Sequence, residues 1–173
     1  MLDLLISTIA QGLLWSLLAL GVYITFRVLD IADLSVEGTF PLGAAVAATC
    51  ITSGHSLVTA FVLAVLAGCV AGAVTGLLTT KLKIPALLSG ILTMIGLYSI
   101  NLRVMGRANL SLLGQTTIYS WGASAGLTEA QTTLAVGLIA ALLVVAVVYW
   151  FFGTEIGLAL RATGYNPQMS RAQ

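Results

Sequence analysis

The sequence predicts an all-α membrane protein that crosses the bilayer about five times. Of its 173 residues, 59% are hydrophobic and 8% are Asp, Glu, Lys or Arg, whereas a soluble domain carries roughly 25% charged residues. The charges are clustered, and residues 4–26 and 130–154 contain none of them. Each of these two segments is long enough to cross about 30 Å of hydrocarbon. A net charge of +1, without a run of Lys or Arg, argues against nucleic acid as a partner.

Apolar segments separated by charged or turn-forming residues define the predicted spans. They cover 4–26, 34–51, 57–79, 84–102 and 132–152. The first has Asp3 as its only early charge and no basic region before it, so we expect a retained helix and not a cleaved signal peptide. The spans form a transmembrane domain over residues 1–153, and a cytoplasmic segment follows over 154–173.

The second span is the least regular of the five. It carries Glu37 near one end and Pro41 inside. Because proline removes a main-chain donor and clashes with the preceding turn, we expect a broken, tilted or re-entrant segment in place of a plain helix.

The third span carries a stripe of small residues at four-residue spacing. Its members are Ala60, Ala64, Gly68, Gly72 and Gly76. Small side chains on one face allow two membrane helices to approach closely. We predict that this stripe forms a helix-packing interface.

Residues 108–128 are predicted to form a loop outside the membrane, with or without a surface helix. Of these 21 residues, 11 are Gly, Ser, Thr, Asn or Gln. Five spans and this loop then place most basic residues on one face, which the positive-inside rule makes cytoplasmic. That face holds Arg27, Lys81, Lys83, Arg161 and Arg171, and the opposite face holds Arg103 and Arg107. If 108–128 spanned the membrane instead, the split would become three against four.

Signatures of catalysis or metal binding are absent from the sequence. His55 is the one histidine and lies in a turn-like break, and no glycine loop of the Walker type is present. Cys50 and Cys69 lie in apolar runs, where a thiol packs as a small hydrophobic group. We therefore expect no enzyme, no metal and no cofactor in this chain.

An acidic segment precedes the second span. Asp30, Asp33 and Glu37 share a face if the segment is helical, and Ser35 lies among them. One interpretation is helix capping, because Asp and Ser side chains accept hydrogen bonds from free amides near a helix start. The other is a polar translocation path, because ionisable groups at membrane depth usually face protein or water. Asp33, Ser35 and Glu37 are the path candidates, and both interpretations can hold together.

The final segment leaves the membrane on the face that is rich in basic residues. Thr154 or Glu155 can begin a short amphipathic helix, Gly164 can end it, and Asn166 can start a second helix before Pro167. Such a helical pair is either a tail lying on the bilayer or a knob that fits another protein. Its two arginines are too few for a polybasic lipid-binding tail.

Three stretches resemble the membrane subunits of bacterial ABC importers, in the group that includes branched-chain amino-acid and ribose-type permeases. Asp33-Leu-Ser-Val followed by Glu37-Gly38 resembles an Asp-Leu-Ser-Val-Gly motif with Glu37 as an extra residue. Lys81-Leu-Lys-Ile-Pro-Ala-Leu-Leu-Ser-Gly-Ile-Leu-Thr-Met resembles the basic, hydrophobic and proline-containing start of a core helix. The stretch from Gly157 resembles the cytoplasmic coupling loop, with its Gly-x-Ala-x-Arg-Ala-x-Gly-x-Asn pattern.

This resemblance implies a permease subunit whose coupling loop inserts into a groove of an ATPase subunit. The coupling residues implied by position are Gly157, Ala159, Arg161, Gly164, Asn166 and Gln168. The implied partners are ATP-binding-cassette ATPase subunits, an extracytoplasmic solute-binding protein, a second permease copy and membrane lipid. ATP hydrolysis would occur on the ATPase, in the cytoplasmic membrane of a bacterium. The second and fourth spans resemble permeases for amino-acid-like solutes, aromatic ones included.

Permeases of this family continue with further spans, whereas the chain stops at Gln173 inside the motif. We therefore expect a truncated permease. Two alternatives stay open. One is a proton-coupled secondary transporter that uses Asp30, Asp33 and Glu37 as a relay. The other is an inert truncated fragment.

Overall fold

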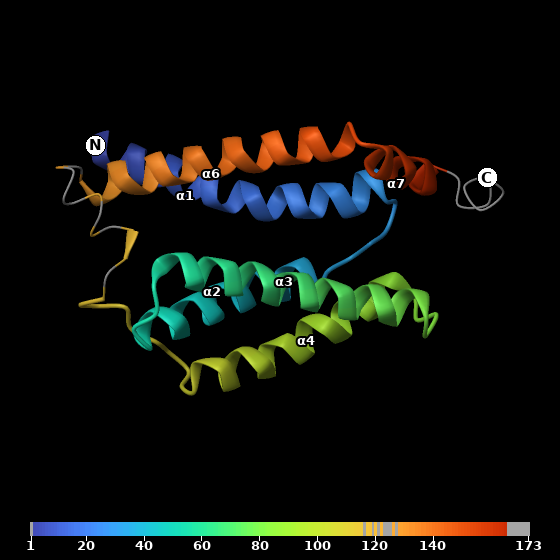
Figure 1. Ribbon diagram of the computed structural model, residues 1–173, viewed down its shortest axis with the longest axis horizontal. Helices are drawn as coiled ribbons and strands as arrows, with labels where there is room; N and C mark the ends of the chain where they lie inside the picture. Colours follow the sequence, from blue (N-terminus) through green and yellow to red (C-terminus); the bar gives the residue numbers. More distant parts are fainter. Residues whose placement is uncertain are drawn as a thin grey trace. The chain divides into compact units, whose positions relative to one another are not determined.

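The computed structural model describes residues 2–115, 117–118, 120, 122, 126 and 128–165. Within this described part, the regular structure is entirely helical (Figure 1). Its elements are α1 (Leu2–Tyr23), the π-helix η1 (Ile24–Val28), α2 (Val36–Thr52), α3 (Leu57–Thr80), α4 (Ala86–Met105), α6 (Glu129–Phe152) and α7 (Glu155–Tyr165).

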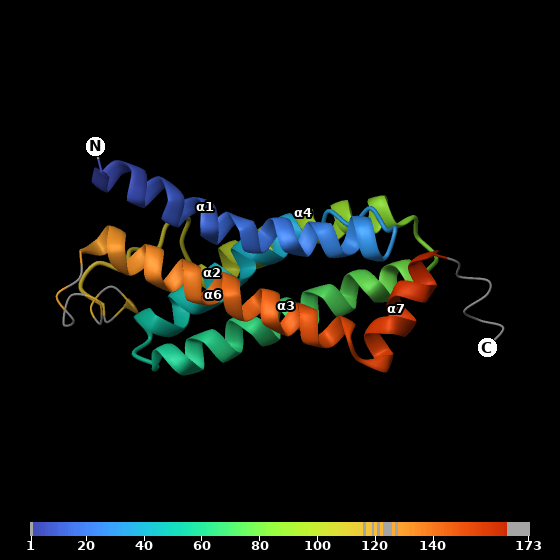
Figure 2. The same cartoon turned by 90° about the horizontal axis from the view of Figure 1, so that it is seen from above.

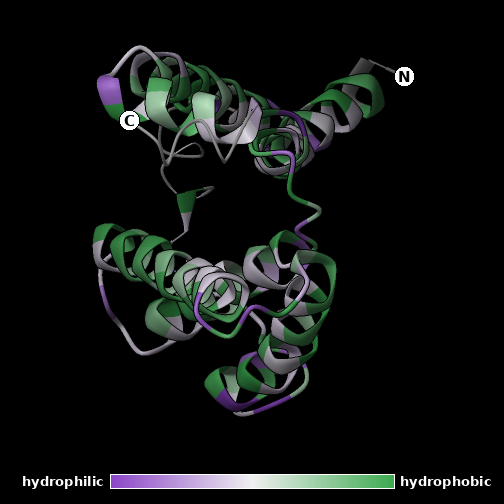
Figure 3. Ribbon diagram, turned by 90° about the vertical axis from the view of Figure 1, so that its right-hand side faces the viewer, coloured by the Kyte–Doolittle hydropathy of each residue, from purple (hydrophilic) through white to green (hydrophobic). Residues whose placement is uncertain are grey.

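Among the described residues, four helical stretches are long and apolar enough to cross a membrane. They are Leu4–Val28, Leu57–Thr80, Ala86–Met105 and Glu129–Phe152, and α2 is a shorter apolar helix of 17 residues. Large apolar side chains are exposed along these helices, with Phe61 69% and Leu142 62% exposed, and Figure 3 shows the apolar colouring around them. Such surfaces suit hydrocarbon, where helices satisfy their own main-chain groups. The prediction of an all-α multi-spanning protein with about five helices is confirmed.

The chain divides into two compact units, Asp33–Trp121 and a second unit made of Met1–Ala32 with Gly122–Gln173. In the first unit, α2 and α4 run parallel, because Gly38 lies against Met94 and the Thr49 hydroxyl donates to the Val104 carbonyl at 3.2 Å. Helix α3 runs antiparallel to α4, because Thr75 meets Thr93 and Thr79 meets Ser89. Leu42, Ala71 and Leu97 form the apolar centre of this three-helix bundle.

Helix α2 passes through Pro41 without interruption. Of the three expected forms of this span, the broken one is therefore wrong for the described chain, and the tilted and re-entrant ones stay predictions. Pro41 lies in the second turn, where its missing N–H removes one main-chain hydrogen bond, the one to the Glu37 carbonyl. Packing of α2 against both α3 and α4 offsets the loss of that bond.

Helix α3 packs within its unit through a face that differs from the predicted small-residue stripe. Ala60 belongs to both, but the other buried positions are Ala71 and Thr75. Gly72 and Gly76 are exposed, and no atom would lie within 4 Å of a Cβ at either. A side chain at the glycine end of the stripe would thus meet open space among the described residues, and the role of the stripe as an interface stays a prediction.

In the other unit, α1 and α6 lie side by side and run in the same direction (Figure 2). Ala10 is fully buried, and a Cβ on Gly137 would lie 3.3 Å from the Leu13 Cβ. The last turn of the first span is wound as the π-helix η1, in which the Leu29 amide donates to the Ile24 carbonyl at 3.1 Å. A short turn after α6 leads into α7.

Candidate functional site

The path candidates lie where the chain enters α2. The Asp33 Oδ1 accepts a hydrogen bond from the Ser35 amide at 2.8 Å, and Ser35 is buried at 3% exposure. This is an Asx turn, which satisfies an amide at the start of a helix. Glu37 lies in the first turn of α2 with an exposed side chain. The structure thus brings Asp33 and Ser35 into contact and directs Glu37 to the surface.

Gly90 of α4 packs directly on this turn. A Cβ built on it would lie 2.7 Å from the Leu34 amide nitrogen and 3.0 Å from the Asp33 Oδ1. One turn further along, a Cβ on Gly38 would lie 2.9 Å from the Met94 Cα. The absence of side chains at both glycines lets α2 and α4 touch through their main chains. Sequence analysis missed Gly90, although its place in a Ser-Gly pair near a helix start was a usable signal.

A row of hydroxyl groups, which we call the hydroxyl seam, connects α3 with α4 next to this turn. The Thr75 hydroxyl donates to the Thr93 hydroxyl at 3.0 Å, and Thr79 and Ser89 share a hydrogen bond of 2.7 Å. Asn101 continues the buried face of α4, and its Oδ1 finds no partner in the described part of the chain. Sequence analysis missed this seam, although buried Ser89, Thr93 and Asn101 recur at multiples of four residues.

The predicted coupling helix begins where expected. The Thr154 hydroxyl accepts from the Gly157 amide at 3.3 Å and donates to the Phe151 carbonyl at 2.6 Å. Threonine at this position satisfies an amide of the first turn. Thr154 therefore connects the end of α6 to the start of α7 and fixes the turn between them.

Three of the predicted coupling residues hold α7 against its own unit. Gly157 is buried, and a Cβ there would lie 2.6 Å from the Phe152 Cα. A Cβ on Gly164 would overlap the Val28 carbonyl oxygen. The Arg161 guanidinium stacks over the Phe152 ring, with 4.9 Å between Cζ and the ring centroid. Gly164 was expected to end this helix, but α7 continues to Tyr165 and Gly164 acts as a contact point.

The remaining predicted coupling residues lie elsewhere. Ala159 is exposed on the face of α7 opposite Gly157. Asn166 and Gln168 lie outside the described residues. Within the described part of the chain, no group of three or more His, Cys, Asp or Glu side chains could hold a metal ion.

Comparison with known proteins places the chain among transport permeases. Residues 4–173 match the family described as the permease component of the branched-chain amino acid transport system. The tyrosine transport system permease protein of Clostridioides difficile (strain R20291) is 39% identical over 168 residues, which are 97% of this chain and 54% of the relative. An uncharacterized protein of Rickettsia prowazekii (strain Madrid E) is 34% identical over 167 residues, 96% of this chain and 57% of that protein. No solved structure matches the chain.

The chain therefore spans about half the length of the curated relatives that it matches. The family match covers nearly all of the chain, including both the turn before α2 and helix α7. The chain belongs to the family of branched-chain amino acid transport system permease components.

Proposed function

We propose that this chain is the permease subunit of an ATP-binding-cassette importer, and that α7 is its coupling helix. In this proposal, it moves a small polar solute, an aromatic amino acid or a similar compound, across a bacterial inner membrane. The family match and the relative named for tyrosine transport support the class of solute. ATPase subunits, a solute-binding protein and a second permease copy complete the proposed assembly.

The observation that carries the proposal is the way α7 is fastened. It contacts both η1 and the end of α6 through Gly164, Gly157 and Arg161. A force applied to α7 by a partner would therefore reach the ends of two spans at once. If the two nucleotide states of an ATPase hold α7 in different positions, their difference in binding free energy shifts the permease between its inward-open and outward-open states.

The opposite face of α7 is the proposed docking surface. Ala159, Ala162 and Thr163 are all exposed there. Their small side chains would let a groove on the partner approach the helix closely. Glycines on one face and short side chains on the other thus give α7 an anchored side and an accessible side.

Docking is tested by co-purification of the ATPase with the full-length permease from detergent-extracted membranes. Ala159→Arg together with Ala162→Arg is expected to abolish ATPase retention and ATP-dependent uptake. Thr80→Arg is the matched control, because Thr80 is exposed and lies next to Lys81 on the same predicted face. Equal ATPase retention by the Ala159 and Ala162 variant would contradict the coupling role of α7.

We also propose that Asp33, Ser35 and Glu37 line the translocation path. Asp33→Asn separates this role from capping, because an asparagine Oδ1 can still accept from the Ser35 amide. We expect solute uptake to fall at least tenfold while the melting temperature stays within about 2 °C, since a retained turn preserves stability. Unchanged uptake would leave Asp33 with the capping role alone. Uptake that survives ATP depletion but stops without a proton gradient would favour the proton-coupled alternative.

A further inference from the structure

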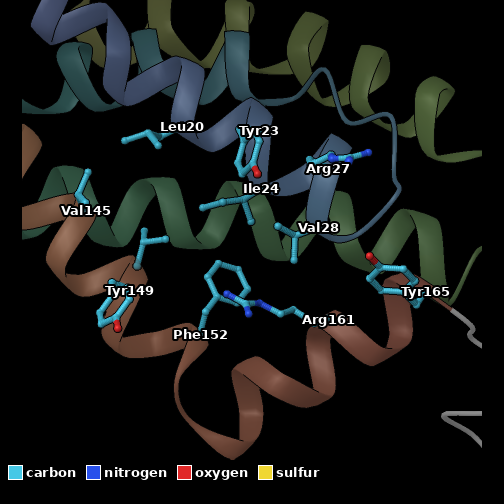
Figure 4. A pocket seen from close by; sticks show the side chains of 11 residues that line it. Leu20, Tyr23, Ile24, Arg27, Val28, Val145, Tyr149, Phe152, Arg161 and Tyr165 are labelled. Carbon is cyan, nitrogen blue, oxygen red and sulfur yellow. The ribbon is translucent and has the colours of Figure 1, made fainter.

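A cavity of about 490 Å³ lies within the unit formed by α1, η1, α6 and α7 (Figure 4). One wall consists of apolar side chains from the last turns of the two spans, among them Leu20, Ile24, Val145 and Val148. Arg27 of η1 and Arg161 of α7 line the same cavity. The site is thus apolar along the spans and cationic toward α7.

Both guanidinium groups have unused hydrogen-bonding capacity. Neither has a carboxylate within 4 Å or a hydrogen-bond acceptor in the part of the chain that the structure describes. Arg161 is held in place by its stacking on Phe152, and stacking uses the face of the guanidinium while its N–H donors stay in the plane. Asp30 lines an adjoining, smaller cavity of about 280 Å³, which Arg27 also lines.

Aromatic residues indicate the depth of this cavity in the bilayer. Tyr23, Tyr149 and Trp150 are 56%, 84% and 71% exposed near the ends of α1 and α6. Exposed Tyr and Trp at the end of a span are typical of the boundary between hydrocarbon and headgroups. The apolar wall therefore lies at the level of acyl chains, and the two arginines lie at the level of lipid phosphates.

We propose that this cavity binds one anionic phospholipid, with its headgroup at the end lined by Arg27 and Arg161 and an acyl chain along Leu20 and Val145. Basic cavities between membrane helices at this depth suit anionic headgroups, and arginine suits phosphate because its donors match the phosphate oxygens. A free phosphate would leave the apolar wall without a partner. A bound lipid would connect η1 to α7 and thereby contribute to the position of α7.

The test uses the purified full-length permease in detergent and counts bound lipids by native mass spectrometry. The probes are dioleoyl phosphatidylglycerol, dioleoyl phosphatidylcholine and inorganic phosphate. We expect one phosphatidylglycerol to bind at least tenfold more tightly than phosphatidylcholine. Arg27→Gln with Arg161→Gln should remove this preference, whereas Arg103→Gln with Arg107→Gln, which also changes two arginines near the end of a span, should retain it.

Val145→Trp checks the result independently of charge, because the larger side chain fills the space beside the apolar wall and both arginines are kept. We expect it to weaken phosphatidylglycerol binding at least fivefold with an unchanged melting temperature. The proposal is overturned if the unmodified permease shows no preference, if the Arg103 and Arg107 control loses it equally, or if 10 mM phosphate displaces the lipid. Because none of these measurements involves ATP or the ATPase, the outcome is independent of the proposed coupling function.

Discussion

In the bundle of α2, α3 and α4, hydroxyl side chains bond from helix to helix in addition to the main-chain contacts at Gly38 and Gly90, whereas in the unit of α1, α6 and α7 the described close contacts centre on glycines. Thr75 with Thr93 and Thr79 with Ser89 represent the first kind of contact, and Gly164 against the Val28 carbonyl represents the second. Hydrogen bonds between hydroxyl groups are directional and fix the register of two helices. Contacts at glycine fix distance alone and have no room for an added carbon.

This difference predicts different sensitivities to mutation. The stability of the α2–α3–α4 bundle should fall when a hydroxyl group is removed. Around Gly90 it should also fall when side-chain volume is added. The packing of the α1–α6–α7 unit should be disturbed most strongly when side-chain volume is added at a glycine. Three substitutions test this comparison.

The largest effect is expected from Gly164→Ala. The added methyl group overlaps the Val28 carbonyl oxygen, and relieving such an overlap costs about 1–3 kcal/mol. Because α7 must shift to make room, ATP-dependent uptake by vesicles that hold the full-length permease should fall roughly tenfold, the factor that corresponds to about 1.4 kcal/mol. Gly96→Ala is the control, since no atom lies near that position. Equal uptake by both variants would show that the contact of α7 with η1 is dispensable.

A smaller but more local effect is expected from Gly90→Ala. Its methyl group would meet the Leu34 amide and the Asp33 carboxylate with less overlap than at Gly164, so we expect the free energy of unfolding in detergent to fall by about 1 kcal/mol, the lower end of the range for overpacking. Gly96→Ala changes the same helix at a position with open space and should be neutral or stabilising by up to about 1 kcal/mol. Thermal unfolding of the two variants gives the comparison directly. Similar melting temperatures would mean that α4 can move away from the turn before α2.

The smallest effect is expected from removal of one hydroxyl in the bundle. A double-mutant cycle of Thr75→Val and Thr93→Val should give a coupling free energy of about 0.6 kcal/mol, with about 1.7 kcal/mol as an upper bound for such bonds in membranes. Thr80→Val is the control for loss of a hydroxyl that makes no hydrogen bond between helices. The exposed Thr80 hydroxyl bonds to the Gly76 carbonyl of its own helix at 2.7 Å. A coupling free energy near zero would mean that the glycine contacts, and not the hydroxyl hydrogen bonds, set the register of these helices.

Much of the architecture could be predicted from the sequence, because hydrocarbon thickness sets the length of an apolar run. The predicted spans 57–79 and 132–152 correspond closely to Leu57–Thr80 and Glu129–Phe152. The start of α7 at Glu155 followed from Thr154, a local capping signal. The Pro41 break was overestimated, because one lost hydrogen bond in a second turn is tolerated in a packed helix.

The parts of the candidate site that sequence analysis missed depend on contacts between distant segments. Gly90 lies 57 positions after Asp33 along the chain, and neither residue indicates the other. The partners of Thr75 and Thr79 are likewise set by the crossing of two helices. The inward side of α7 could not be deduced either, because Gly157 and Gly164 are equally suited to ending a helix or to contacting a neighbour.

The π-helix at the end of the first span has a consequence for how the chain tolerates changes in length. In an α-helix, each residue turns the chain by about 100°, and the wider turn at Ile24–Val28 holds more residues than an α-helical turn does. Such wider turns usually accommodate one additional residue within an otherwise α-helical segment. A single-residue deletion there would restore ordinary winding while Val28 keeps its orientation toward Gly164. The contact between α7 and the first span is thus buffered against a one-residue change in length at η1, with the sequence of α7 itself unchanged.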